Sequence, residues 1–286
     1  MANTKFKITT DSAVDLSDKT LAKNNIEIAR LNLMIDGKSH QDRAIPVSEI
    51  VRLLNEGHII QTSTPTPNEY NDLWGRLLDD YEHIFHFSMS SAKSSSFQLA
   101  SMLANDELIH PNRITVIDSK HLAAGLGQVV LKAAGALEET NKIEELIQKF
   151  NSLIERTEMV GVLSTVKHAK EGGRLVKVMG ASDRIGLIKK AYLVQMEDGR
   201  LRNIGLGIGS AEKRAQKLFD KALEDKIEND FVVMGTNKPL HSLNPIITGM
   251  TNLSEVFHVE KSEIGTAVSA HSGPGTFALA YTRKKY

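Results

Sequence analysis

The stretch FHFSMSSAKSSSFQLA, residues 85–100, decides the fold class of this chain. Ile84, Phe85 and Phe87 are apolar and aromatic, as in a buried strand. From Phe97 onward the apolar residues recur at helical spacing. A cluster of serines and Lys93 lies between the two patterns. We therefore expect a strand that ends in hydroxyl groups and leads directly into a helix.

Hydroxyl groups at the start of a helix favour an anion site. The first N–H groups of a helix have no partner within the helix, and the helix dipole adds a partial positive charge there. A simple polar turn with a serine N-cap explains the same residues. The stretch alone leaves both interpretations open.

Two further strands are expected to end in a carboxylate followed by a hydroxyl. Residues 6–10 run into Asp11-Ser12, and residues 114–117 run into Asp118-Ser119. Helical segments alternate with the strands, which is typical of a parallel α/β sheet. In such sheets the ligand crevice lies at the carboxyl ends of the strands, so the three polar ends are expected to meet in one cleft. The expected helices cover residues 16–24, 46–57, 123–137 and 144–155, and one more strand covers residues 26–35.

Thr62 and Ser63 are expected in a loop just before another helix. Thr66 and Glu69 have the spacing of a capping box. Pro67 fits the first position of the helix that follows. The two hydroxyl groups therefore lie just ahead of a helix N-terminus.

The alternation of strands and helices ends near residue 158. A turn at residues 197–200, Glu-Asp-Gly-Arg, joins two strand-like segments as in a hairpin. A helix is expected at residues 211–223, with strands at 231–234 and 256–259. The expected fold is α/β with two domains. Residues 1–158 form an α/β/α domain with a parallel sheet, and residues 159–286 form an α+β domain with a mixed sheet.

Two glycine-containing runs in the second half are candidate ligand contacts. His271-Ser-Gly-Pro-Gly275 combines a histidine, which can donate a hydrogen bond to an anion, with glycines that permit close approach of the backbone. Gly172-Gly173-Arg174 is a glycine turn with an arginine suited to an oxyanion or a partner. A turn with an incidental histidine and an exposed loop arginine remain alternatives.

Composition excludes several classes of protein. The chain has 286 residues with 35 Lys and Arg against 35 Asp and Glu, so its net charge does not favour a nucleic-acid partner. It has no cysteine, which excludes disulfides, thiolate catalysis and zinc–sulfur sites. No apolar leader and no membrane-length apolar run is present. We expect a soluble cytoplasmic protein without stable membrane insertion.

Metal and nucleotide cofactors are not expected. His83 and His86 are three residues apart on an expected strand, so they face opposite sides of it. Residues 205–210 resemble a dinucleotide fingerprint but lack its final glycine. A serine hydrolase with Ser94, His271 and either Asp11 or Asp118 is the rival enzyme interpretation. The chain has no G-x-S-x-G nucleophile elbow, and only geometry identifies a triad.

Six runs, taken in order, resemble the DegV family over essentially the whole chain. They are Thr10-Asp11-Ser12, Thr62-Ser63-x-Pro65, Ser90-Ser91-x-x-Ser94, 116–119, Gly172-Gly173-Arg174 and His271-x-Gly273-Pro274-Gly275. The resemblance implies the two-domain fold described above and a tunnel between the domains that binds one long-chain fatty acid. It also implies a carrier, not an enzyme, which presents the fatty-acid carboxylate to a fatty-acid kinase and carries the acyl phosphate toward phospholipid synthesis. No cofactor is expected besides this lipid, and the carrier is expected to be a monomer.

The resemblance also assigns roles to residues. Ser94 and Thr62 resemble the hydroxyls that bind the carboxylate, with His271 as their neighbour at the headgroup. Ser63, Asp11 and Ser119 are expected to line or support the same pocket. Arg174 resembles a residue used in working with the kinase. A regulatory module that binds another small anion in this cleft remains a third interpretation.

Overall fold

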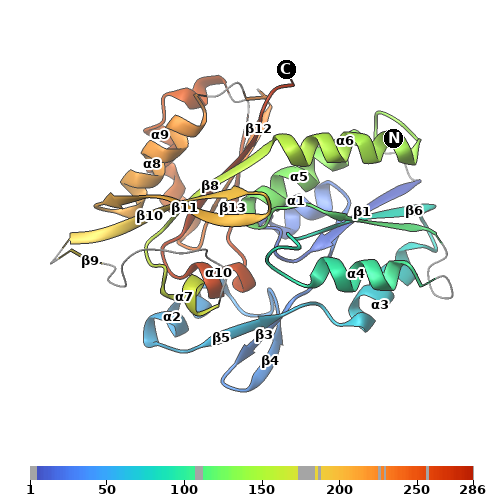
Figure 1. Cartoon of the computed structure of the whole chain (residues 1–286), viewed down its shortest axis with the longest axis horizontal. Coiled ribbons are helices and arrows are strands. Elements are labelled where there is room, and N and C mark those ends of the chain that lie inside the picture. The colour runs from blue at the N-terminus through green and yellow to red at the C-terminus, as the bar shows by residue number, and fades with distance from the viewer. Residues whose placement is uncertain are drawn as a thin grey trace.

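The computed structural model describes residues 5–106, 112–172, 184–185, 188–224, 227–228, 230–255 and 258–285. Two sheets with their helices lie side by side, and a small three-stranded sheet lies at the bottom of the view in Figure 1. One large sheet is parallel and the other is mixed. The expected α/β fold is therefore confirmed.

The first sheet has the strand order β2 (Ile26–Ala29), β1 (Phe6–Asp11), β6 (His83–Ser88) and β7 (Ile114–Asp118), all parallel. Every residue of β1 and β6 is buried because helices cover both faces. Ile84 packs against the helices on one face and Phe85 against those on the other, since side chains alternate along a strand.

The helices of this half are placed as the strand–helix alternation predicts. One face carries α3 (Pro67–Leu77) and α4 (Ser96–Ala104), and the other carries α5 (Ala123–Ala136) and α6 (Ile143–Arg156) (Figure 1). A short helix, α1 (Asp18–Lys23), follows β1. The expected start of α3 is confirmed, because the Thr66 side chain accepts a hydrogen bond from the Glu69 backbone N–H at 3.2 Å.

The second sheet begins with β8 (Thr157–Leu163). Its strand order is β11-β10-β8-β14-β12-β13, and only β12 and β13 pair in parallel among these described strands. The other strands are β10 (Ile188–Glu197), β11 (Arg200–Ile208), β12 (Phe231–Thr236), β13 (His258–Glu263) and β14 (Phe277–Thr282), with β9 (Arg184–Ile185) paired to β10. The expected hairpin at residues 197–200 is confirmed as the turn between β10 and β11.

Short helices connect and cover these strands. The helix expected at residues 211–223 is confirmed as α8 (Ala211–Ala222). The remaining helical segments are α7 (Lys167–Glu171), α9 (Asn244–Thr248), α10 (Thr266–Ser272), η1 (Leu240–Leu243) and η2 (Asn252–Glu255).

The strand expected at residues 26–35 is wrong as a single element. The chain leaves the parallel sheet after Ala29 and enters the small antiparallel sheet at Asn32. This small sheet consists of β3 (Asn32–Ile35), β4 (Lys38–Gln41) and β5 (Ile60–Ser63), with α2 (Val47–Glu56) packed against it. Thr62 and Ser63 therefore end a strand and do not lie in a loop, because they pair with β3.

One hydrophobic core joins the two large sheets. Helix α5 is buried along most of its length between them. It contacts β1 of the first sheet and β12 and β14 of the second. The core cluster accordingly includes Phe85 and Phe87 together with Val233 and Ala278. A domain boundary at residue 158 stays a prediction, since the packing is continuous across it.

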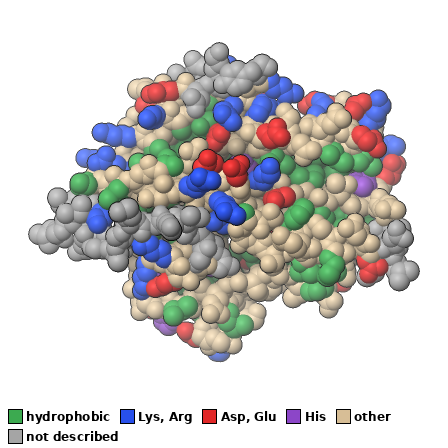
Figure 2. Space-filling view, viewed as in Figure 1, with side chains coloured by type: hydrophobic (Ala, Val, Ile, Leu, Met, Phe, Trp, Pro, Cys, Tyr) green, Lys and Arg blue, Asp and Glu red, His purple; other side chains and the backbone are tan. Residues whose placement is uncertain are grey.

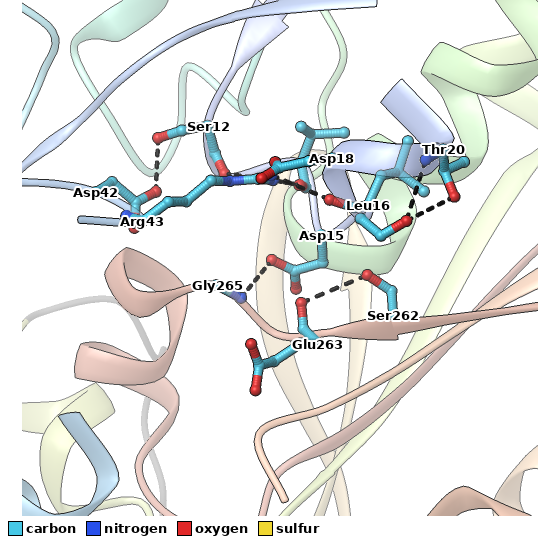
Figure 3. Close-up of polar contacts among 12 residues, drawn as sticks. Ser12, Asp15, Leu16, Asp18, Thr20, Asp42, Arg43, Ser262, Glu263 and Gly265 are labelled. Carbon is cyan, nitrogen blue, oxygen red and sulfur yellow. Dashed lines mark hydrogen bonds and ion pairs between the residues drawn. The ribbon is translucent and has the colours of Figure 1, made fainter. Parts of the chain in front are cut away.

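Polar contacts also cross between the two halves, close to the start of α10 (Figure 3). Asp42 accepts hydrogen bonds from the Ala267 backbone N–H at 3.0 Å and from the Thr266 hydroxyl. Its other oxygen accepts from the Ser12 hydroxyl at 2.6 Å. Asp42 therefore caps the start of α10, although it lies in the other half of the protein.

Asp15 makes a second contact of this kind. Its Oδ1 accepts a hydrogen bond from the Gly265 backbone N–H at 2.8 Å, while its buried Oδ2 has no partner among the described residues. Burial is the largest influence and raises the pKa of Asp15 from 3.8 to about 8, against the opposing effects of the Gly265 hydrogen bond and Arg43. Asp15 is therefore protonated at neutral pH.

The raised pKa predicts an unusual pH dependence of stability. In the unfolded chain Asp15 loses its proton near pH 4, and in the folded protein it keeps the proton up to about pH 8. The folded state thus binds more protons in this window, so the contribution of Asp15 to stability falls as pH rises from 4 to 8. Asp15→Asn mimics the protonated form and is expected to gain at least about 1 kcal/mol over the wild type between pH 5 and pH 9. Urea unfolding at both pH values measures this change.

Asp18→Asn is the control for this experiment, because Asp18 is exposed and forms an ion pair at 3.1 Å with Arg43, whose charge also acts on Asp15. Its stability difference from the wild type is expected to change little with pH. An Asp15→Asn difference that stays constant from pH 5 to pH 9 contradicts the assignment of Asp15 as a buried neutral acid.

Candidate functional site

The loop that follows β6, residues 89–95, is held from both sides by carboxylates at the ends of neighbouring strands. Asp11 at the end of β1 accepts hydrogen bonds from the Ser88 hydroxyl at 2.7 Å and from the Met89 backbone N–H at 2.8 Å. Asp118 at the end of β7 accepts from the Ser91 backbone N–H at 3.1 Å and from the Ser91 hydroxyl. The polar strand ends do meet, and what they bind is this loop, which we call the serine loop.

Asp11 is completely buried and takes a further hydrogen bond from the Tyr70 hydroxyl at 2.8 Å. Burial, and then the neighbouring Asp11 carboxylate, raise the pKa of Tyr70 above its usual range, so Tyr70 remains a donor. Three donors satisfy the carboxylate inside the protein, as a buried charge requires. Asp11 is therefore a support of the serine loop.

The serine loop leads into α4 as expected. Ser94 Oγ accepts a hydrogen bond from the Ser96 backbone N–H at 3.1 Å and lies 2.8 Å from Ser96 Oγ. Ser95 occupies the N-cap position but makes no capping hydrogen bond with its side chain. The Ser94 hydroxyl thus lies at the N-terminus of α4, where the helix dipole favours negative charge.

Thr62 and His271 are in contact across the two halves of the protein. Thr62 Oγ1 lies 2.7 Å from His271 Nε2. The alternative of a turn with an incidental histidine is wrong in its placement, because His271 lies in the last turn of α10 and the turn follows Gly273. The sequence around His271 gives no sign of a helix, because α10 is short and the residue that caps it, Asp42, is distant in sequence.

Glycine is required next to this histidine. A Cβ atom at Gly172 would lie 2.4 Å from His271 Nδ1, which is closer than any real contact of this kind. A Cβ atom at Gly273, where φ is +75°, would lie 2.7 Å from His168 Cδ2. One glycine of each run therefore permits close packing: Gly172 against His271 itself, and Gly273 against His168 just after the helix that carries His271.

A cavity of about 550 Å³ lies between the serine loop, β5 and α10. This volume is within the range of roughly 300–1,000 Å³ that small-molecule sites occupy. Its polar side chains come from all three elements, and the remainder of the lining is apolar. The lining residues are Ala13, Leu31, Thr62, Ser63, Thr64, Met89, Ser91, Ala92, Lys93, Ser94, Ser95, Leu122, Ala169, Leu201, Ala267, Val268, His271 and Ser272.

The tip of the β10–β11 hairpin docks on the serine loop. The Ser90 hydroxyl donates a hydrogen bond to the Gly199 carbonyl at 2.6 Å, and both partners lie in buried surroundings. Leu201, two residues later, lines the cavity. The second sheet thus contributes part of the cavity wall through its hairpin.

The structure brings together four of the six expected ligand-binding residues. Thr62, Ser63, Ser94 and His271 line the cavity, whereas Asp11 and Ser119 do not. Ser119 is completely buried, and its hydroxyl accepts a hydrogen bond from the His121 backbone N–H at 3.1 Å. Asp11 and Ser119 are not part of the cavity wall, because their side chains are buried inside the protein at the ends of strands. Arg174 lies outside the described residues.

Sequence reasoning missed several residues of the cavity. Leu201 and Leu122 look like ordinary core residues in the sequence, and nothing local distinguishes them. Ser272 has a signal, since it follows His271 directly, but its hydroxyl received no role. No group of metal-binding side chains is present among the described residues, and none of the described helices has the length and apolar character to cross a bilayer.

A model of the DegV family, described as an uncharacterised protein family, matches residues 5–284. The chain belongs to the DegV family. A DegV domain-containing protein of Caldanaerobacter subterraneus subsp. tengcongensis is 28% identical over 289 residues, covering 98% of this chain and 99% of the relative.

Solved DegV structures have the same fold. A fatty-acid-binding DegV family protein from Thermus thermophilus has a TM-score of 0.80 and 24% identity, covering 97% of this chain and 99% of its own. A DegV family protein from Eubacterium eligens loaded with heptadecanoic acid has a TM-score of 0.83 and 18% identity, covering 98% and 100%. The two-domain DegV fold implied by the sequence motifs is thereby confirmed.

The docked hairpin predicts that Gly199 is intolerant of a side chain. Its φ is +73°, and a Cβ atom would lie 2.6 Å from Ser90 Oγ. Gly37 is a matched control, because its φ is +78° and a Cβ atom there meets nothing within 4 Å. Gly199→Ala is expected to destabilise the protein by at least about 1 kcal/mol more than Gly37→Ala, since it also breaks a buried hydrogen bond. Equal losses for the two variants in chemical unfolding contradict docking of the hairpin.

Proposed function

We propose that this DegV protein binds one long-chain fatty acid in the cavity between its two halves. The observation that carries the proposal is a largely apolar cavity whose wall includes Ser94 at a helix N-terminus and the Thr62–His271 pair. Hydroxyl groups beside a helix N-terminus suit a carboxylate, and the apolar wall suits an acyl chain. The fatty-acid-binding relatives support the same ligand class.

Energetics are consistent with tight retention. Burial gains about 0.8 kcal/mol per methylene, so roughly fifteen methylenes contribute on the order of 12 kcal/mol before costs. The loss of ligand freedom and headgroup desolvation reduce this sum. Hydrogen bonds to the carboxylate limit the cost of headgroup desolvation, because each oxygen exchanges water for a donor of the protein.

The fatty acid would serve as cargo of a carrier. We propose that the protein presents the carboxylate to a fatty-acid kinase and carries the acyl phosphate toward phospholipid synthesis. The family motifs support this role, with Arg174 as the residue that works with the kinase. Thr62 and His271 also line an adjoining hollow of about 290 Å³, so the headgroup pair borders a second cavity. Acidic and basic side chains both occur over the face shown in Figure 2, which gives no support to a nucleic-acid partner.

The contacts of the candidate triad do not favour a serine hydrolase. His271 Nε2 lies against Thr62, and the Ser94 hydroxyl lies against Ser96. Asp11 and Asp118 are both engaged in holding the serine loop. A nucleophile needs an adjacent base oriented by a third group, and these contacts do not form that relay.

The first test is mass spectrometry of the purified protein, native and after organic extraction. An added mass of a few hundred daltons that is released as a free fatty acid supports the proposal. A lipid-free mass that stays unchanged after incubation with mixed fatty acids overturns it and favours another small anion as ligand. Turnover of acyl esters would favour the hydrolase.

Ser94→Ala is expected to reduce fatty-acid retention at least about tenfold, because it removes a donor to a charged group. Ser17→Ala is the matched control. Ser17 Oγ caps α1 by accepting a hydrogen bond from the Thr20 backbone N–H at 3.1 Å, just as Ser94 Oγ accepts one from the Ser96 N–H. Ser17 is not among the residues that line the cavity. Both variants should lose similar stability, about 1 kcal/mol, and only Ser94→Ala should lose lipid. Equal lipid content in all three proteins removes Ser94 from the site.

A further inference from the structure

The hydroxyl of Ser272 is the buried polar group in the cavity wall that the fold leaves unsatisfied. Ser272 is the last residue of α10 and lines the cavity next to His271. Its Oγ is buried and has no hydrogen-bond partner among the described residues. A buried hydroxyl without a partner costs about 1–3 kcal/mol, so its position calls for a ligand-based explanation.

The neighbouring hydroxyls show that the fold satisfies such groups elsewhere. Ser269, one turn earlier in α10, donates to the Ile264 carbonyl at 3.0 Å. Ser164, on the segment facing this turn, donates to the Gly275 carbonyl at 2.9 Å. Thr276 donates to the Gly273 carbonyl at 2.9 Å. Ser272 differs from all three because its hydroxyl has no partner among the described residues and the residue belongs to the cavity wall, so a rotation about its side-chain bond is what would bring Oγ to the cavity surface.

The backbone of Ser272 is fixed, so the hydroxyl cannot leave the cavity by a shift of the helix end. The Gly273 N–H donates to the Ser269 carbonyl at 2.9 Å, and the Gly273 carbonyl accepts from Asn237 Nδ2 at 2.7 Å. The Ser272 carbonyl lies 3.2 Å from the Thr276 hydroxyl that also donates to Gly273, so the two carbonyls share this donor. Only rotation about the side-chain bond remains, and it moves Oγ within the cavity wall.

We propose that the Ser272 hydroxyl is a further headgroup donor, which binds one oxygen of the ligand carboxylate. The inference rests on the proposed function, because it takes the ligand to be a fatty acid. A carboxylate has two oxygens with several acceptor positions, so it can accept from Ser272 while it also contacts the Thr62–His271 pair or Ser94. A fatty alcohol has one oxygen, so it gains less from this extra donor. Ser272 therefore contributes to selection of acids over alcohols.

The test compares Ser272→Ala with the wild type, both stripped of lipid and titrated with palmitate and with hexadecanol. Removal of the hydroxyl is expected to weaken palmitate binding about tenfold or more, and hexadecanol binding less. The same change is expected to leave the melting temperature of the lipid-free protein unchanged or higher, since no hydrogen bond is lost and an unsatisfied group is removed. If the hydroxyl had a merely structural role, its removal would lower this melting temperature.

Ser269→Ala is the matched control, because Ser269 is buried in the same helix and its hydroxyl bonds the protein. It is expected to lower the melting temperature and to keep the affinity for palmitate. Ser272→Cys, which keeps nearly the same volume with a weak donor, should resemble Ser272→Ala in affinity.

The outcomes separate the two proposals. If the wild type binds palmitate and Ser272→Ala binds it equally well, the role of Ser272 is overturned and the proposed function stands. If the wild type binds no fatty acid, the proposed function fails and the role of Ser272 falls with it. A lower melting temperature of lipid-free Ser272→Ala shows that the hydroxyl serves the fold and overturns the inference as well.

Discussion

The geometry of the site depends on the carboxylate of Asp42. It accepts from Thr266 and Ala267 at the start of α10 and from Ser12 at the end of β1. Helix α10 carries His271, and β5 carries Thr62, so the distance between these residues follows from how α10 is placed against the N-terminal half. A buried carboxylate with several donors fixes that placement more sharply than apolar packing, because each hydrogen bond has a preferred direction.

The serine loop, on the other side of the cavity, is likewise held by hydrogen bonds to carboxylates. Asp11 and Asp118 accept hydrogen bonds from backbone N–H groups of the loop, so its path is set by strand ends that a buried sheet keeps rigid. The hydroxyl of Ser94, which lines the cavity, lies three residues beyond Ser91 and stays at the start of α4. Carboxylates outside the cavity lining, two of them buried (Asp11 and Asp42) and one half-buried (Asp118), thus position the polar groups of the cavity.

Much of the architecture could be predicted from local patterns. The strand, serine loop and helix of residues 85–100, the cap at Thr66 and the hairpin at residues 197–200 all follow from residue types at fixed spacing. The break between β2 and β3 could not be predicted, because apolar residues continue through it and only pairing with different sheets separates the strands. Asp11 and Ser119 were correctly placed at strand ends, but whether a strand-end side chain faces the cavity or the loop depends on tertiary packing. The helix at His271 escaped prediction because its capping residue, Asp42, lies far away in the sequence.

The contact between Thr62 and His271 joins residues that are 209 positions apart. During synthesis the first of them leaves the ribosome long before the second, so the N-terminal half spends that interval without His271. A chain that stops short of α10 has the serine loop but lacks the histidine that contacts Thr62 and one wall of the cavity. The complete cavity therefore exists only in a chain whose two halves have both folded and docked.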